Sequence, residues 1–116
     1  MEFRKLKVYN LAIDFTADIY EISKIIPEHE KYGLTNQLRR AAVSITLNIA
    51  EGSGGGSDAE FSRFLRMAIR SLYEVDAILE LLIKLKYCKK EQLSEIYEKR
   101  LVLGSMLGKF IKTLKS

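Results

Sequence analysis

The sequence predicts an all-α fold, an antiparallel up-and-down four-helix bundle. Apolar residues recur at steps of three and four in four separate segments, which is the period of amphipathic helices. The 116 residues include one proline, and no stretch alternates apolar and polar residues over more than a few positions. The connections between the four segments are short, and short connections favour antiparallel neighbours.

The first helix is expected over residues 11–26, because Pro27 disfavours helical backbone in the residue before it. Residues 29–33 then connect it to a second helix, expected over residues 34–50. Apolar residues of this second helix fall on one side and are expected to face the core: Leu34, Leu38, Ala41, Ala42, Ile45 and Ile49.

The third helix is the longest and is expected over residues 58–85. Ser57 and Glu60 mark its start, because their spacing is that of a capping box. Residues 51–57 read EGSGGGS and are expected to form a flexible connector, since glycine is a poor helix former. The fourth helix is expected over residues 91–115. One domain, residues 1–116, is predicted, because two domains would each be too small for a core.

The composition excludes several classes of protein. Apolar residues make up 47% of the chain and charged residues 29%, as in globular domains. One cysteine, Cys88, excludes an internal disulfide, and one histidine, His29, does not supply the usual zinc sites. The Glu-x-x-His pairs of di-iron bundles are missing, so neither a metal nor a cofactor is expected.

The motifs of catalysis and of membrane insertion are missing as well. The glycine-rich segment lacks the Gly-Lys-Ser/Thr of a phosphate-binding loop, and no nucleophile has a candidate base, so no catalytic residues and no enzyme activity are expected. The amino-terminal segment is charged, and no run of about 18 apolar residues occurs. We therefore expect a cytoplasmic protein that makes no contact with a membrane.

The second helix has apolar residues on two sides. Val43 and Leu47 lie roughly opposite its core side, together with Arg40. The small residues Ala41, Ala42 and Ser44 allow close approach by a neighbouring helix. We therefore predict a subunit interface at Val43 and Leu47, with a second copy of the chain as the partner.

A polar stripe lies between these two sides, formed by Gln37, Ser44, Asn48 and Glu51. Such groups need hydrogen-bond partners when they are half-buried between helices. The stripe has two interpretations: a hydrogen-bond network that fixes the register of the helices, or a recognition patch for a polar ligand.

Arginines on the third helix form a candidate nucleic-acid-binding set. The net charge is +4, and from residue 86 onward eight Lys and Arg face three Glu. Arg63, Arg66 and Arg70 fall within roughly 60° of one another around the helix, where their guanidinium groups can each engage a phosphate. Arg39 and Arg40 complete the set.

The alternative is a salt-bridged face exposed to solvent, because Glu74 follows Arg70 by four residues and can pair with it. No aromatic residue interleaves with these arginines, so stacking of single-stranded bases is not expected.

A long series of these residues resembles the signature of the 23S rRNA-intervening sequence protein family. Members of this family are bacterial four-helix-bundle proteins encoded within intervening sequences of ribosomal RNA genes. The resemblance covers nearly the whole chain in order and spacing. It is carried by Pro27, Tyr32-Gly33-Leu34, Gln37, Arg39-Arg40-Ala41-Ala42, Ser44-Ile45, Asn48-Ile49-Ala50-Glu51-Gly52, Phe61, Phe64-Leu65, Ala68, Ser71-Leu72 and Glu74.

The resemblance implies a left-handed up-and-down bundle that assembles as a ring, commonly a homopentamer. It places Gln37, Arg39, Arg40, Ser44, Asn48 and Glu51 in the polar signature of the family. Accessory proteins of diversity-generating retroelements are more distantly similar, and those are basic pentamers that contact a reverse transcriptase and nucleic acid. The loop departs from the family, because three glycines at 54–56 stand where polar or basic residues are common.

Together these observations predict a non-enzymatic homo-oligomer that binds RNA or DNA through basic helix faces. The alternative is a protein–protein interaction module or assembly scaffold, with a partner protein of unknown identity and no nucleic-acid contact. That alternative is supported by the polar stripe and by the acidic residues Glu74, Asp76 and Glu80.

Overall fold

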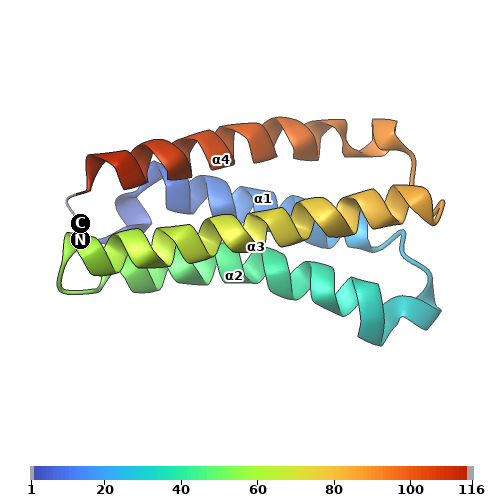
Figure 1. Ribbon diagram of the computed structural model, residues 1–116. Helices are drawn as coiled ribbons and strands as arrows, with labels where there is room; N and C mark the ends of the chain where they lie inside the picture. Colours follow the sequence, from blue (N-terminus) through green and yellow to red (C-terminus); the bar gives the residue numbers. More distant parts are fainter. Residues whose placement is uncertain (1, 115–116) are drawn as a thin grey trace.

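The computed structural model describes residues 2–114 and contains four long helices (Figure 1). They are α1 (Lys7–Ser23), α2 (Asn36–Ser53), α3 (Asp58–Lys84) and α4 (Ser94–Thr113). Each helix runs antiparallel to the one before it, and both ends of the described chain lie at the same end of the bundle. The predicted fold class is therefore confirmed.

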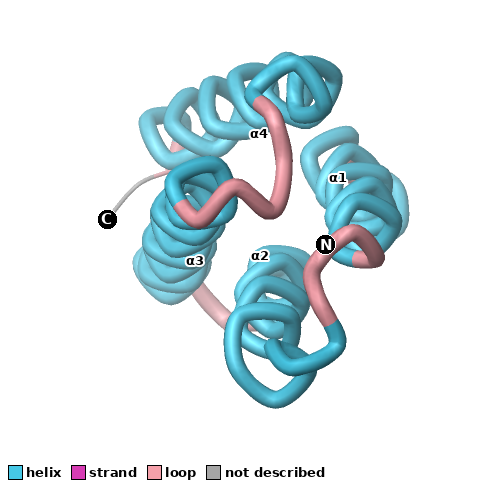
Figure 2. Tube along the Cα trace, turned by 90° about the vertical axis from the view of Figure 1, so that its right-hand side faces the viewer, coloured by secondary structure: helices cyan, strands magenta, loops and turns pink. Residues whose placement is uncertain are grey.

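The four helices form a square in cross-section (Figure 2). α1 packs against α2 and α4, and α3 packs against the same two helices, so α1 and α3 are diagonal to each other. Short helical turns precede three of the long helices: η1 (Phe3–Lys5), η2 (Glu28–Glu30), η3 (Lys31–Thr35) and η4 (Lys90–Leu93). Between residues 2 and 114, no helix combines the length and apolar character needed to cross a bilayer.

All four helices contribute to the core. The largest side chains with no exposed surface are Phe15, Ile19, Leu38, Ile45, Ile49, Leu65, Leu72, Leu79, Leu82, Leu93, Leu103 and Leu107. The structure leaves Phe64 half-buried at the α2–α3 contact and buries Leu103 completely.

The predicted connector at 51–57 is wrong for its first three residues. α2 continues through Gly52 to Ser53, and only residues 54–57 link it to α3. A Cβ atom on Gly52 would lie 2.7 Å from Cβ of Phe64 and 2.9 Å from Cδ1 of Phe61. The packing of α2 on α3 thus requires a glycine here, and the burial gained offsets its weak helix propensity.

The other helix ends follow local signals to within a few residues. Ser57 Oγ accepts a hydrogen bond of 3.1 Å from the backbone N–H of Glu60, so α3 begins where the capping motif predicted. α1 ends at Ser23 rather than just before Pro27, and α2 begins only after the wide turn of η3. The segment 90–93 is a 3₁₀ turn instead of the first turn of α4.

Two ion pairs fasten α4 to its neighbours. Arg100 donates to both carboxylate oxygens of Asp76 on α3, at 2.7–3.0 Å, and this contact raises the pKa of the guanidinium. Lys99 Nζ lies 2.6 Å from Oδ2 of Asp18 on α1, and the pKa of Lys99 is raised by this carboxylate. These pairs fix α4 in register with both adjacent helices.

Replacement of Gly52 by alanine is expected to destabilise the protein by about 1–2 kcal/mol. Overpacking against Phe61 and Phe64 costs about 1–3 kcal/mol, and the better helix propensity of alanine returns up to about 1 kcal/mol. Urea unfolding followed by circular dichroism measures the change. Gly108→Ala is the matched control, because a Cβ there meets no atom of the described chain within 4 Å and should leave stability unchanged or raised. Equal stability of the two variants would contradict the prediction.

Candidate nucleic-acid interface

The candidate interface is the outward face of α3 near the end of the bundle that holds the termini. Leu65, Ala68 and Leu72 are fully buried against the core. Because the helix turns 100° per residue, Arg63, Arg66 and Arg70 lie on the opposite side, and all three are exposed. We call Arg63, Arg66 and Arg70 the α3 stripe.

The three arginines of the α3 stripe have different surroundings. Arg63 Nη2 donates to Oε1 of Glu60 at 2.7 Å, and this hydrogen bond lowers the pKa of the carboxyl group. Arg66 Nη1 donates to Oγ of the buried Ser62 at 2.8 Å, which anchors one nitrogen of its guanidinium. The side chain of Arg70 makes no hydrogen bond or ion pair with any residue from 2 to 114. Two of the three guanidinium groups therefore have no acidic partner.

The pair that would have neutralised Arg70 does not form. The alternative interpretation paired Arg70 with Glu74, one turn further along α3, but no ion pair joins these side chains in the described structure. The salt-bridged interpretation of this face therefore holds for Arg63 with Glu60 alone. Arg66 and Arg70 keep donors that can meet a phosphate.

Arg39 and Arg40 are not part of the α3 stripe. Arg39 Nε donates to Ser23 Oγ at 2.8 Å, and its guanidinium lies 4.9 Å from the centre of the Tyr20 ring. Arg39 thus belongs to the contact between α1 and α2, where it is half-buried. Arg40 is exposed and lines a surface hollow together with Arg39 and Leu47.

An aromatic residue that was not among the predicted site residues lies on the same face as the α3 stripe. Tyr73 follows Arg66 by seven residues and Arg70 by three, so it lies almost directly in line with Arg66 along α3. Tyr73 is 62% exposed. The expectation that no aromatic residue interleaves with these arginines did not consider Tyr73, which extends their face by about one turn beyond Arg70. The signal was present in the sequence as an i, i+4, i+7 spacing of residues 66, 70 and 73.

The polar stripe of α2 divides into two parts. Asn48 Nδ2 donates to the backbone oxygen and the hydroxyl of Ser44, at 2.9 and 3.1 Å. The hydroxyl of Ser71 on α3 also donates to Ser44 Oγ, at 2.9 Å. Ser44 and Asn48 thus form a network that joins α2 to α3. The side chains of Gln37 and Glu51 are exposed and make no hydrogen bond within residues 2–114.

Val43 and Leu47 lie where α2 meets α1 at the surface. Together with Ile13, Ala17 and two threonines, they line an open apolar hollow of about 340 Å³, which we call the α1/α2 groove. Leu47 is 54% exposed and Ile13 is 43% exposed. The groove extends the apolar surface predicted on α2 with residues from α1.

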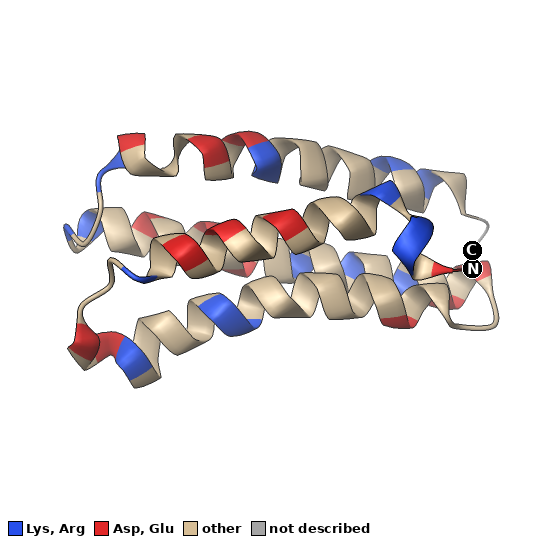
Figure 3. Ribbon diagram, turned by 180° about the vertical axis from the view of Figure 1, so that it is seen from behind, with Lys and Arg blue, Asp and Glu red and all other residues tan. Residues whose placement is uncertain are grey.

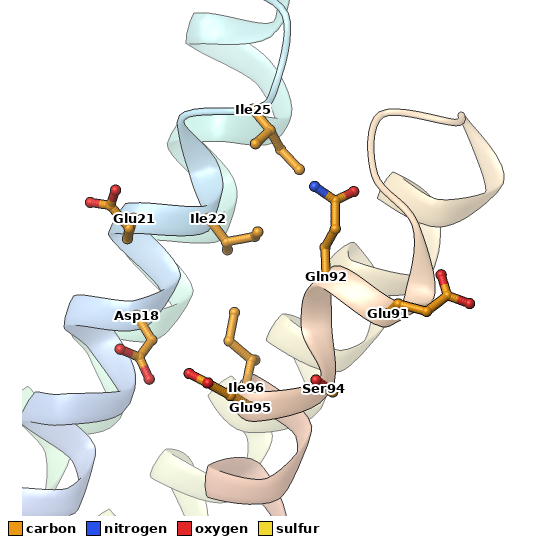
Figure 4. A pocket seen from close by; sticks show the side chains of 9 residues that line it. All are labelled: Asp18, Glu21, Ile22, Ile25, Glu91, Gln92, Ser94, Glu95 and Ile96. Carbon is orange, nitrogen blue, oxygen red and sulfur yellow. The ribbon is translucent and has the colours of Figure 1, made fainter.

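A second hollow lies between α1 and the start of α4, and in contrast to the apolar α1/α2 groove it is lined by acidic side chains (Figure 4). The carboxylates of Asp18 and Glu95 point into it from its two sides, above a floor that includes Ile22 and Ile96. Asp18 is paired with Lys99 and Glu21 with Lys24, whereas Glu91 and Glu95 make no ion pair between residues 2 and 114, so the hollow keeps negative charge that disfavours a phosphate. In the described chain, no group of three or more His, Cys, Asp or Glu is arranged to hold a metal ion.

The two residues with reactive side chains occupy the opposite end of the bundle. Cys88 is buried, and this burial raises the pKa of its thiol, whereas a nucleophilic thiol needs a lowered pKa. His29 Nε2 lies 3.3 Å from the hydroxyl of Tyr87, which donates to Oε2 of Glu30 at 3.0 Å. These side chains join the loops that precede α2 and α4.

Comparison of this chain with known proteins identifies its family. A solved crystal structure from Bacteroides thetaiotaomicron, described as a protein with unknown function from the S23 ribosomal protein family, is 28% identical. The match covers 90% of this chain and 98% of that one, with a TM-score of 0.82. The comparison with curated proteins gave no match. Residues 4–109 match the family described as 23S rRNA-intervening sequence protein, and the chain therefore belongs to this family.

Proposed function

We propose that the protein is a non-enzymatic, cytoplasmic homo-oligomer that binds RNA or DNA through the basic half of each bundle. The distribution of charge along the bundle carries this proposal (Figure 3). When each helix is divided at its middle, the half with the termini comprises residues 2–14, 46–71 and 104–114. This half contains eight Lys and Arg and five Asp and Glu. The other half contains ten Lys and Arg and ten Asp and Glu.

Within residues 2–114, the excess of three positive charges therefore lies at the end of the bundle that holds the termini. The α3 stripe belongs to this end, together with Lys109 and Lys112 of α4 and the basic residues near Phe3. A localised basic surface binds the phosphate backbone by releasing counterions, so its affinity depends on salt and little on sequence.

Assembly strengthens this interaction. One subunit at +4 attracts nucleic acid weakly, whereas the five copies of a pentamer would carry about +20. The α1/α2 groove supplies a reason to assemble, because its lining is apolar and Leu47 stays half exposed in the single chain. A second copy that covers the groove removes this apolar surface from water.

A protein-interaction module is the second candidate function. The hollow that contains Asp18 and Glu95 favours it, because carboxylates above an apolar floor suit a basic, partly apolar protein segment. In that case purified protein binds no nucleic acid at low salt.

Leu47→Asp is expected to separate the subunits. The variant places a carboxylate in the α1/α2 groove, where a covering subunit would have to desolvate it. Native mass measured by light scattering over a range of concentrations should fall to that of a single 13.3 kDa chain. Leu81→Asp is the control, because Leu81 is exposed to a similar degree on α3. Wild-type protein that stays monomeric, or a Leu47→Asp variant of unchanged mass, would refute assembly through this groove.

Arg66→Ala and Arg70→Ala are each expected to reduce the salt dependence of RNA binding. Loss of one phosphate contact lowers the slope of log affinity against log salt concentration by about 1. Fluorescence anisotropy with labelled RNA, titrated between about 50 and 200 mM salt, gives the slope. Lys84→Ala removes one positive charge from the same helix in the charge-balanced half and should leave the slope close to the wild-type value. Equal slopes for all three variants would rule out the α3 stripe as the phosphate-binding surface.

A further inference from the structure

We infer that Tyr73 is a base-stacking residue and that the α3 stripe with Tyr73 binds single-stranded nucleic acid in preference to duplex. The inference rests on the proposed nucleic-acid binding and adds the form of the nucleic acid. Tyr73 is 62% exposed, and its hydroxyl makes no hydrogen bond within residues 2–114.

The ring of Tyr73 has a neighbour from α4 on one side. The guanidinium carbon of Arg100 lies 6.0 Å from the centre of the Tyr73 ring. Arg100 is held in place by its two-oxygen contact with Asp76, so the cation beside the ring belongs to the packed interface of α3 and α4. The tyrosine thus stands on a rigid helix with a fixed neighbour, while most of its surface is open to a ligand.

The arginines of the same face supply the phosphate contacts that a stacked nucleotide needs. Along the helix axis, Tyr73 lies about 4.5 Å from Arg70 and about 10.5 Å from Arg66, at 1.5 Å per residue. This length corresponds to about three stacked nucleotides of one strand. Arg66 and Arg70 have no acidic partner in the described chain, so they are free to follow the backbone of a strand whose base stacks on Tyr73.

The preference for a single strand follows from which surfaces each ligand offers. In a duplex, the faces of the bases are stacked on one another and only phosphates and groove edges are accessible. In a single strand, a base can leave its neighbours and stack on an aromatic ring, and this contact tolerates any sequence. Arginines alone bind both forms, whereas an exposed ring among arginines contributes only to the single strand.

Tyr32 provides a matched control within the chain. It is also an exposed tyrosine, at 87%, and it also lies near a cation, with Lys31 Nζ 5.7 Å from its ring centre. It belongs to η3 at the charge-balanced end of the bundle, beside η2, which contains Glu28 and Glu30. A base stacked on Tyr32 would find no arginine stripe beside it.

The test uses a labelled 20-nucleotide DNA strand of unstructured mixed sequence and the duplex it forms with its complement. Fluorescence anisotropy at low salt measures the affinity of the full chain for each. Tyr73→Ala is expected to weaken single-strand binding by about 5- to 100-fold, the usual range for loss of one stacking contact, and duplex binding by less than about 2-fold. Tyr73→Phe, which keeps the ring, and Tyr32→Ala should both bind as the wild type does.

Other results would overturn the inference in distinguishable ways. If Tyr73→Ala binds the single strand as well as the wild type does, or weakens both forms equally, Tyr73 is not a stacking residue and the proposed electrostatic binding stands. If the wild type binds neither form, the proposed nucleic-acid function fails as well. If Tyr73→Ala has a lower native mass with unchanged circular dichroism, Tyr73 belongs to a subunit contact.

Discussion

The close contact between α2 and α3 is the constraint on which the exposed surface depends. Gly52 lets Phe61 and Phe64 approach the α2 backbone, and the hydroxyls of Ser44 and Ser71 meet at 2.9 Å further along the same contact. These contacts leave α3 little freedom to rotate about its axis. Because side-chain direction on a helix follows that rotation, the same packing turns Arg66, Arg70 and Tyr73 outward. The candidate site is thus positioned by the core beneath it.

The positions of the acidic residues also determine the charge of this surface. Asp76 and Asp18 are engaged by Arg100 and Lys99, the two cations at the middle of α4. These ion pairs hold the helices together and cancel charge in the centre of the bundle. Fewer carboxylates remain toward the termini, and there the arginines of α3 are left in excess. The basic end therefore results from the placement of acids as much as from the placement of arginines.

Features that depend on one helix were predictable, and those that depend on two were not. The four helices follow from apolar spacing, and the start of α3 follows from Ser57, because both signals are local. The helical state of Gly52 depends on Phe61 and Phe64 of the next helix, so glycine content alone gave the wrong boundary. Arg39 could not be separated from the other arginines, since its partners Ser23 and Tyr20 lie on α1. Tyr73 is different, because its spacing from Arg66 was visible along the sequence.

The two proposed surfaces are compatible because they lie on different sides of the molecule. The α1/α2 groove opens between α1 and α2, whereas α3 is diagonal to α1 and carries its arginines on the side away from the core. A subunit seated in the groove of one copy does not need to touch the arginines or Tyr73 of that same copy. Each added copy would then contribute another basic surface with its own exposed tyrosine ring. A nucleic-acid strand that passes from one copy to the next would contact the same residues again in each copy. Assembly would in this way turn a weak single site into a continuous one.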